Sequence, residues 1–554
     1  MILPPARLLR NAALYLIGTA SCVVFIHVVT SIAGAETISL YLRTSYRTYP
    51  LLLLGLPAAA GLLCLIIAFL FIRDSLHGNA ARPYPALQIT AALLLLACVV
   101  SAGLFFRQQA RRYAGAPGAP ERLQARIGPV AQPGPFRDRR ADASCSMVIW
   151  YFDPTRNTLP AEIEFGADTA AAPLALRRET ADGDGRRHEF RLTGLLPGVR
   201  YRYRAPAGSG AWRFFTTAPV RGAVLRFLCL ADTGNTLAGG GALSYYGEVT
   251  RAAAGLFRAT GIVPSFMVHA GDLVRTGMDL GGWAYAFSSN ALADSIPFIA
   301  APGNHDFLED GGANFRYFFN RPDYCSIDYG DCRIILLHPY DGPGRTLDGP
   351  VICSGEEQYR WLTRELSRPR DGRWLIVVLH NPILSTGDYG VNELLAEQYL
   401  SLFREKRVDL VVSGHDHNFD AFLADGGSPW GGTLYLVTGT GGSHLDAAIM
   451  EQHERRWLDW RQDRSTGRGP YQSDYFTRNF HLYGELSWGF TEVELGGGVM
   501  TVTYRRWLSF PRFLEITGQD RRSWDMVRLD AGKTPHAGIT GLAEAWTFRK
   551  KRGK

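Results

Sequence analysis

The chain has 554 residues, of which 46% are hydrophobic and 20% are charged, and its formal net charge is +7. This length exceeds that of a typical single domain, and the composition excludes a disordered or collagen-like chain. Residues 1–112 hold nine Lys or Arg and two Asp or Glu, so this segment alone carries the excess charge. The remainder has 50 residues of each sign, which argues against a nucleic-acid-binding domain.

Three apolar stretches open the chain, at about residues 12–33, 51–72 and 87–106, and none of them contains Lys, Arg, Asp or Glu. About 20 apolar residues in a helix match the hydrocarbon thickness of a bilayer. The pattern therefore predicts three membrane-spanning helices and a multi-pass membrane protein.

The first stretch has a second interpretation as a signal peptide. Arg7 and Arg10 precede it, and Ala-Gly-Ala at 33–35 follows it like a signal-peptidase site. Its apolar part is longer than a usual signal-peptide core, which favours a retained helix. An N-terminus inside the cell then places the large domain outside after three crossings, whereas the arginines within 107–112 argue for the reverse. Because long domains cross membranes largely regardless of such charges, we expect the large domain outside the cytoplasm.

Residues 114–135 are rich in Ala, Gly and Pro, a composition typical of an extended spacer. Short β-like runs separated by turn formers then follow, and this spacing predicts a β-sandwich. Residues 192–203 and 212–219 resemble the tyrosine corner and last strand of a fibronectin type III-like module, in which a Tyr hydroxyl closes the turn before its strand. We expect a packing and positioning domain here, without chemistry of its own.

Five later apolar runs each end in polar residues. In chain order these endings are Asp232-Thr233-Gly234, Gly271-Asp272, Gly303-Asn304-His305-Asp306, His380-Asn381-Pro382 and Gly414-His415-Asp416-His417. Helix-like segments, such as 356–366 and 392–404, lie between several of the runs. Strands that end at one edge of a sheet would gather these side chains where open α/β folds bind ligands.

The residue types at these endings favour metal chemistry. Carboxylates and imidazoles bind divalent or trivalent first-row metals, and one carboxylate between two ions can bridge them. Two ions about 3.5–4 Å apart polarise a phosphoryl group and make hydroxide available near neutral pH. One such ending alone is typical of a turn or a cap, but five in order predict a hydrolytic two-metal site.

The ordered set of endings resembles the calcineurin-like metallophosphoesterase superfamily. Asp-x-Gly at the first ending, together with the preceding β module, resembles its purple acid phosphatase branch. The resemblance covers about residues 124–505 and implies an α/β metallophosphatase fold, with two facing β-sheets flanked by helices. It implies two divalent or trivalent ions, with iron, zinc or manganese as candidates. The implied ligands are Asp232, Asp272 and His417 for the first metal, and Asp272, Asn304, His380 and His415 for the second.

Two catalytic roles also follow from the resemblance. Asp272 would bridge the two metals, and His305 would bind the phosphate or protonate the leaving group.

The sequence departs from the purple acid phosphatase pattern at the first metal. Three residues after the bridging Asp272, where those enzymes have a Tyr ligand to ferric iron, this chain has Arg275. Gly234 takes the place of a His that other superfamily members supply. Only three protein ligands can therefore be named for the first metal, so we expect water or Asn235 to complete it and the protein not to be purple.

Substrate contacts should differ as well. Arg275 either offers its guanidinium to a substrate phosphate or pairs with a local carboxylate. No His occurs between His380 and His415, so the substrate-contacting His residues of plant members have no counterpart in that segment.

The combined expectation is a membrane-anchored phosphohydrolase with an extracytoplasmic catalytic domain that cleaves phosphate monoesters. Its expected partners are a phosphate ester and the lipid bilayer, and not nucleic acid. The expected units are a membrane region at 1–112, a linker at 113–123, a β-sandwich at 124–219, a metallophosphoesterase domain at 220–510 and a C-terminal extension at 511–554. Two alternatives remain, a phosphodiesterase acting on a nucleotide or lipid headgroup and a non-catalytic membrane scaffold with a decayed phosphatase domain.

Overall fold

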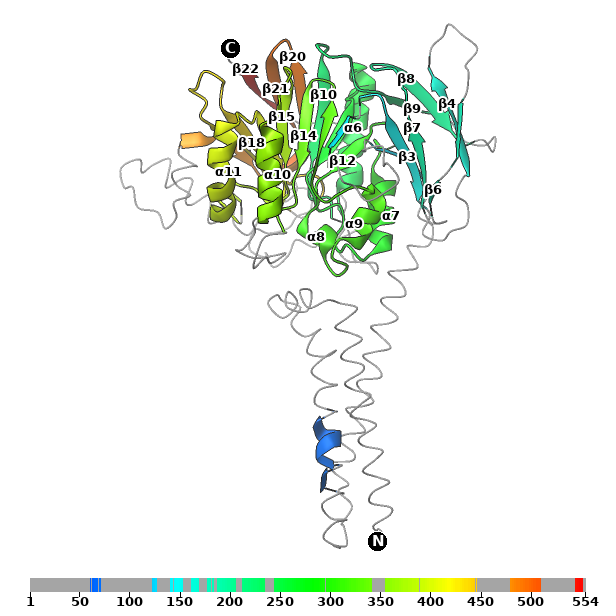
Figure 1. Cartoon of the computed structure of the whole chain (residues 1–554), viewed down its shortest axis with the longest axis vertical. Coiled ribbons are helices and arrows are strands. Elements are labelled where there is room, and N and C mark those ends of the chain that lie inside the picture. Colours follow the sequence, from blue (N-terminus) through cyan, green and yellow to red (C-terminus); the bar gives the residue numbers. More distant parts are fainter. Residues whose placement is uncertain are drawn as a thin grey trace. The chain divides into compact units, whose positions relative to one another are not determined.

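The computed structural model divides the chain into two compact units, Met1–Tyr113 with Glu309–Gly311 and Ala114–Leu308 with Gly312–Lys554. The residues that the structure describes are 60, 62–67, 69–70, 122–126, 140–142, 144–152, 161–168, 177–180, 182–183, 187–205, 212–234, 244–293, 295–340, 354–387, 389–443, 445, 479–509 and 544–551. All strands and labelled helices in Figure 1 belong to the second unit.

The three stretches expected to cross a membrane lie mostly outside the described residues. Within them the structure describes helical backbone at Ala60, 62–67 and 69–70. Across the described part of the chain, no helix has both the length and the apolar character needed to cross a bilayer. This finding corrects the prediction of three transmembrane helices, and with it the multi-pass localisation, the extracytoplasmic catalytic domain and the bilayer as a partner.

Two large β-sheets form the centre of the second unit (Figure 1). The ten-stranded sheet has the order β22 (Glu544–Lys551), β21 (Val499–Ser509), β20 (Ser487–Gly496), β10 (Leu225–Leu230), β11 (Phe266–His269), β12 (Phe298–Ala300), β1 (Arg122–Arg126), β3 (Met147–Phe152), β7 (Arg187–Leu192) and β6 (Asp182–Gly183). The eight-stranded sheet has the order β19 (His481–Glu485), β17 (Phe419–Ala424), β18 (Thr433–Thr438), β16 (Leu410–Ser413), β15 (Trp374–Val378), β14 (Cys332–Leu336), β13 (Cys325–Tyr329) and β2 (Arg140–Asp142).

The central strands are buried on both faces, which explains their nearly continuous apolar sequences. In β10, Leu225, Phe227 and Cys229 pack between the two sheets. Leu228 and Leu230 point the other way, toward helices, because side chains alternate along a strand. Strands β10, β11 and β12 run parallel to one another, as do β14, β15, β16 and β18. Parallel strands bring their carboxyl ends to a single edge.

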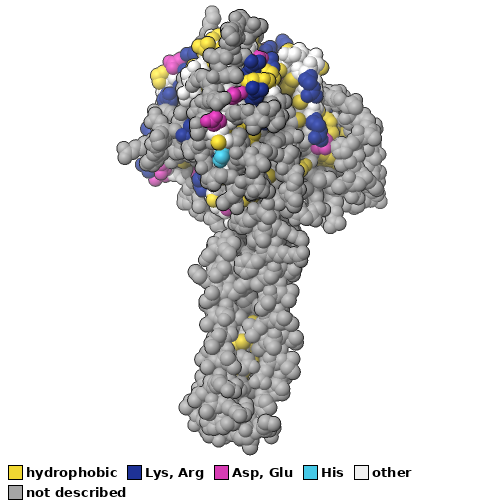
Figure 2. Space-filling view, turned by 90° about the vertical axis from the view of Figure 1, so that its right-hand side faces the viewer, with side chains coloured by type: hydrophobic (Ala, Val, Ile, Leu, Met, Phe, Trp, Pro, Cys, Tyr) yellow, Lys and Arg dark blue, Asp and Glu magenta, His cyan; other side chains and the backbone are white. Residues whose placement is uncertain are grey.

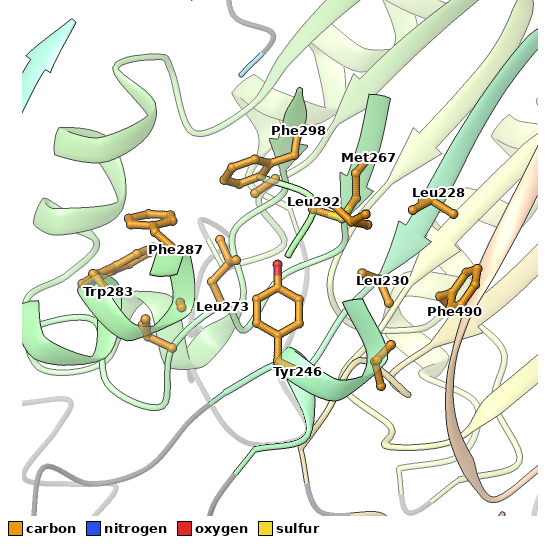
Figure 3. Close-up of a cluster of buried hydrophobic side chains, with 14 of the residues drawn as sticks. Leu228, Leu230, Tyr246, Met267, Leu273, Trp283, Phe287, Leu292, Phe298 and Phe490 are labelled. Carbon is orange, nitrogen blue, oxygen red and sulfur yellow. The ribbon is translucent and has the colours of Figure 1, made fainter. Parts of the chain in front are cut away.

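Helices cover the outer face of each sheet. The ten-stranded sheet is covered by α6 (Tyr246–Thr260), α7 (Leu280–Ser289), α8 (Asn304–Phe307) and α9 (Ala313–Phe319), and the eight-stranded sheet by α10 (Glu356–Leu366) and α11 (Glu393–Glu405). Figure 3 shows part of the first of these cores, in which Tyr246 of α6 and Trp283 and Phe287 of α7 lie over Met267 and Phe298 of the sheet. The expected arrangement of two facing sheets flanked by helices is confirmed.

A smaller four-stranded sheet packs against one end of the ten-stranded sheet. Its order is β5 (Arg177–Thr180), β4 (Glu162–Ala167), β8 (Arg200–Arg204) and β9 (Arg213–Thr216). Ile149 of β3, Phe165 of β4 and Phe190 of β7 lie in the buried core between the two layers. The Tyr201 hydroxyl accepts a 2.9 Å hydrogen bond from the backbone N–H of Leu196, so a Tyr closes the turn before β8.

The four-stranded sheet and strands β3 and β7 form a β-sandwich, and β3 and β7 also belong to the ten-stranded sheet. Strand β1 pairs with β3 along its whole length and with β12 at Arg126 and Phe298. Residues 122–126 were expected to lie at the boundary between linker and sandwich, but they form the strand that joins the two parts of the sheet. Composition does not reveal such a strand, because pairing depends on neighbours that are distant in sequence.

Charges of both signs are interspersed on the described surface. On the side seen in Figure 2, basic and acidic side chains lie among one another. Ion pairs across neighbouring strands contribute to this pattern, such as Arg226 with Glu494 at 2.7 Å and Arg204 with Glu164 at 3.1 Å.

Candidate metal centre

The polar residues that follow five strands converge in the structure. They are Asp232 after β10, Asp272 after β11, Asn304 and His305 after β12, His380 after β15, and His415 and His417 after β16. The first three strands belong to the ten-stranded sheet and the last two to the eight-stranded sheet. The site therefore lies where the carboxyl edges of the two parallel sets meet.

Two carboxylates and two imidazoles form the centre of this cluster. Asp232, Asp272 and His380 are buried, and each offers a ligand atom within 4.8 Å of the others. Nε2 of His380 lies 3.3 Å from Oδ2 of Asp272 and 3.8 Å from Oδ1 of Asp232. Nε2 of His417 lies 3.4 Å from the same Asp232 oxygen. Oδ1 of Asp232 thus faces two imidazole nitrogens at once.

Backbone N–H groups fix the other oxygen of each carboxylate. The N–H of His415 donates to Oδ2 of Asp232 at 2.8 Å, and the N–H of His305 donates to Oδ1 of Asp272 at 2.9 Å. Nδ1 of His415 lies 3.2 Å from Oδ1 of Asn304. A backbone N–H from another strand ending therefore orients each carboxylate. Its second oxygen, Oδ1 of Asp232 or Oδ2 of Asp272, faces His380.

Two buried atoms of the cluster indicate that a cation fits there. Oδ1 of Asp232 and Nε2 of His380 make no hydrogen bond within the described residues. A buried carboxylate oxygen without a partner is costly unless a positive charge compensates it. Carboxylate oxygens, imidazole nitrogens and an amide oxygen together suit iron, zinc or manganese. The residues present thus fit a metal ion.

The backbone at the site adopts a conformation that non-glycine residues rarely take. Asp232, Asp272 and His415 have φ values of 56°, 57° and 70°. Such left-handed residues cost about 1–3 kcal/mol each and are retained where the surroundings hold them. Here two backbone hydrogen bonds link the turns after β10 and β11. The N–H of Asp232 donates to the carbonyl of Gly271 at 3.1 Å, and the N–H of Thr233 donates to the carbonyl of Asp272 at 3.0 Å.

Two glycines allow the carboxylates to approach the backbone closely. A Cβ atom at Gly303 would overlap the carboxylate of Asp272, and one at Gly414 would overlap that of Asp232. Any side chain at either position would displace a proposed ligand.

Asp306, which ends the Gly-Asn-His-Asp run, lies at the site but was assigned no role from the sequence pattern. Its buried carboxylate accepts hydrogen bonds from the N–H groups of Asp272 at 2.9 Å, Gly303 at 3.0 Å and Val274 at 3.2 Å. Burial, followed by the charge of Asp272, raises the pKa of Asp306 to about 8. The spacing could have indicated a turn-closing acid, but not which backbone groups it binds.

His305 lies on the more open side of the cluster, and its ring contacts the backbone of Arg275. Nδ1 of His305 lies 2.8 Å from the carbonyl oxygen of Arg275, which can only accept, so this nitrogen carries the proton. Nε2 lies 4.0 Å from Oδ2 of Asp272, and the His305 side chain is 32% exposed. The half-buried Arg275 side chain makes no ion pair with any described residue, so no local carboxylate neutralises it in this part of the chain.

Burial and neighbouring charge set the protonation of the cluster. Burial opposes ionisation of Asp272, but His380 and His305 outweigh it and hold the pKa of Asp272 below its ordinary value. Burial, and then His380, holds the pKa of His415 well below its usual range. An ionised Asp272 and a neutral His415 are the forms that bind metals.

The metal-free protein is expected to lose stability as the pH rises from about 6.5 to 9. Burial disfavours a charged His380, but Asp272 and Asp232 outweigh it and raise its pKa to about 9. The unfolded chain releases this proton near pH 6.5, whereas the folded protein holds it until about pH 9. The free energy of unfolding should therefore fall by an amount on the order of 3 kcal/mol over this pH range.

Bound metal requires neutral His380 and should remove this pH dependence. Urea unfolding at both pH values, with and without metal, measures the effect, and metal-free His380→Gln serves as the control without the titrating group. Equal pH dependence in the metal-free and metal-loaded proteins would contradict the assignment.

Comparison with known proteins shows which family part of the chain resembles. Residues 225–419 match the model of the family described as calcineurin-like phosphoesterase. An uncharacterized protein of Mycobacterium tuberculosis is 28% identical over 296 residues, which cover 46% of this chain and 54% of that protein. Purple acid phosphatase 21 of Arabidopsis thaliana is 24% identical over 307 residues, which cover 51% of this chain and 65% of that protein. The matches thus span between half and two thirds of these relatives.

A solved structure of PhoD shares the fold, with a TM-score of 0.50 and 11% identity over 77% of this chain and 90% of that one. The chain therefore contains a calcineurin-like metallophosphoesterase domain, and purple acid phosphatases are among its relatives.

Proposed function

We propose that this protein hydrolyses phosphate monoesters with two metal ions, in the manner of purple acid phosphatases. One observation carries the proposal: the buried, unpartnered Oδ1 of Asp232 and Nε2 of His380 face each other beside Asp272. Buried ligand atoms that face each other without a hydrogen bond are expected where closely spaced cations lie between them. The similarity to purple acid phosphatases supports a phosphate ester as the substrate.

Two sets of residues would hold the ions. The first set is Asp232, Asp272 and His417, and the second is Asp272, Asn304, His380 and His415. When bound, two such ions polarise the phosphoryl group and supply hydroxide for in-line attack on phosphorus. Asp272 belongs to both sets, and the N–H of His305 orients it so that Oδ2 faces His380.

Two further side chains would act on the substrate. His305 donates its Nδ1–H to the Arg275 carbonyl, so Nε2 is the nitrogen that faces the substrate. With the ring in its doubly protonated form, the Nε2–H would bind a phosphate oxygen or pass its proton to the leaving oxygen. The Arg275 guanidinium, without a carboxylate partner among the described residues, would bind phosphate oxygens.

The β-sandwich would position the catalytic domain. We assign residues 124–219 to a fibronectin type III-like module on the basis of the Tyr201 hydrogen bond, and residues 220–510 to the metallophosphoesterase domain. Because β1 joins the two parts in one sheet, the module would act as a rigid extension rather than a tethered domain.

The iron-loaded protein is expected to lack a visible tyrosinate absorption band. Arg275 occupies the position at which the resemblance places a Tyr ligand, so no phenolate is supplied from there. Absorption spectra of the iron-loaded wild type test this, and Arg275→Tyr is the matched variant that should gain the band. A tyrosinate band in the wild type would show that another Tyr ligates the iron.

Metal analysis combined with two substrates tests the proposed activity. The metal-loaded protein should cleave p-nitrophenyl phosphate with a higher kcat/KM than bis(p-nitrophenyl) phosphate. The reverse preference would favour a phosphodiesterase, because the same centre can cleave both bond types. Bound metals without either activity would favour the non-catalytic scaffold.

A further inference from the structure

The loop between β15 and α11 brings an exposed aromatic ring to the metal centre. Its base is closed by a 3.2 Å hydrogen bond from the N–H of Asn392 to the carbonyl of Ile383. Tyr389, near its tip, is 56% exposed. The ring centroid of Tyr389 lies 4.1 Å from that of His415, with 33° between the planes. Tyr389 thus covers one face of a proposed metal ligand and keeps much of its own surface open to solvent.

Two buried carboxylates anchor this loop. Oδ1 of Asp416 accepts a hydrogen bond from the N–H of Tyr389 at 3.1 Å, and Gly387 lies so close to Asp416 that a Cβ atom would not fit. Asp420 accepts hydrogen bonds from the N–H of Thr386 at 2.8 Å and from its hydroxyl at 2.9 Å. Both acids are fully buried and lie in the segment that carries His415 and His417. The loop is therefore attached to the metal-binding segment.

Anchoring and location distinguish Tyr389 from an ordinary exposed apolar side chain. A single exposed ring needs no explanation by itself. Here, however, side-chain acceptors in the metal-binding segment fix the loop backbone at Thr386 and at Tyr389 itself. The outcome is a ring held next to His415 at the edge of the site, where the organic part of an ester would extend while its phosphate contacts the centre.

We infer that Tyr389 is a specificity residue that packs against the organic group of the substrate and favours planar, aromatic leaving groups. The inference rests on the proposed function. Aromatic pairs contribute about 0.5–1.5 kcal/mol beyond the area they bury, which corresponds to a preference of about two- to tenfold. Tyr389 takes no part in bond cleavage, so its effect should appear in binding and KM and leave kcat nearly unchanged.

Binding of two phosphonates to the metal-loaded protein tests this inference without turnover. Phenylphosphonate and methylphosphonate share the anionic group and differ in the ring. We expect titration calorimetry to show about two- to tenfold tighter binding of phenylphosphonate to the wild type. Tyr389→Ala should remove this preference with methylphosphonate affinity within about twofold of wild type, and Tyr389→Phe should retain it.

Metal content measured on each variant separates a contact role from a structural one. A preference for phenylphosphonate that persists in Tyr389→Ala overturns the inference, as does the absence of binding by either phosphonate. An equal loss of affinity for both phosphonates together with loss of metal also overturns it, because the ring would then only support His415.

The two proposals fail separately. A ring-dependent preference without hydrolysis of phenyl phosphate would retain the role of Tyr389 and reject the proposed activity. Hydrolysis of phenyl phosphate without a ring-dependent preference would do the opposite.

Discussion

Asp272→Asn is expected to lower kcat/KM for an aryl phosphate by about a thousandfold or more. The carboxylate is buried, its Oδ1 accepts the N–H of His305, and its Oδ2 lies 3.3 Å from Nε2 of His380, which suits a ligand shared by two ions. An amide removes the charge that would hold the cations together, and metal ions contribute several kcal/mol to transition-state stabilisation, at about 1.4 kcal/mol for each factor of ten. The effect is measured as steady-state kcat/KM of the wild type and the variant at saturating metal, with the metal content of both proteins determined in parallel.

Asp371→Asn is the matched control for this substitution. Asp371 also has a positive φ, at 48° against 57° for Asp272, so both changes place Asn in the same backbone region. Its side chain is 58% exposed and pairs with Arg373. Activity should therefore stay near that of wild type. Substantial activity of Asp272→Asn at saturating metal would contradict the proposed bridging role.

Asp306→Ala is expected to destabilise the fold by about 3 kcal/mol or more and to weaken metal binding. The change leaves the N–H groups of Asp272, Gly303 and Val274 without their acceptor in a buried site, at about 1–3 kcal/mol for each lost partner. It also releases the turn that orients Asp272. Urea unfolding gives the loss of stability, and titration of the folded variant with zinc gives the loss of affinity.

Two variants define the scale of this effect. Asp306→Asn retains one acceptor oxygen and should lose less stability than Asp306→Ala. Asp323→Ala removes a carboxylate that pairs with the partly exposed Arg316 at 2.7 Å, and such pairs contribute about 1 kcal/mol or less. If Asp306→Ala cost no more than Asp323→Ala, the three backbone contacts would not stabilise the site as described.

The local pattern was sufficient to predict the central elements of the fold. Apolar runs at 225–231 and 375–379 form β10 and β15, and the expected helix at 356–366 is α10. The polar endings of these strands were expected to gather at one edge, and the structure brings Asp232 and His380 within 3.8 Å. Side-chain alternation and strand endings are local properties, so sequence alone reveals them.

Contacts between distant segments could not be predicted in this way. Strand β1 lies within a stretch whose composition suits a linker, and β22 adds to the edge of the sheet from the C-terminal extension. Asp306 and Asp416 act through backbone N–H groups that are close only after folding. The apolar stretches near the N-terminus satisfied the length rule for membrane spans, but composition does not establish a helix of that length.

Anomalous diffraction from crystals grown with zinc or manganese would locate the proposed ions. Two peaks are expected about 3.5–4 Å apart with Asp272 between them, one beside Asp232 and His417 and the other beside Asn304 and His380. Asp232 and His417 turned away from Asn304 and His380, with no anomalous density among them, would contradict the proposed two-metal site.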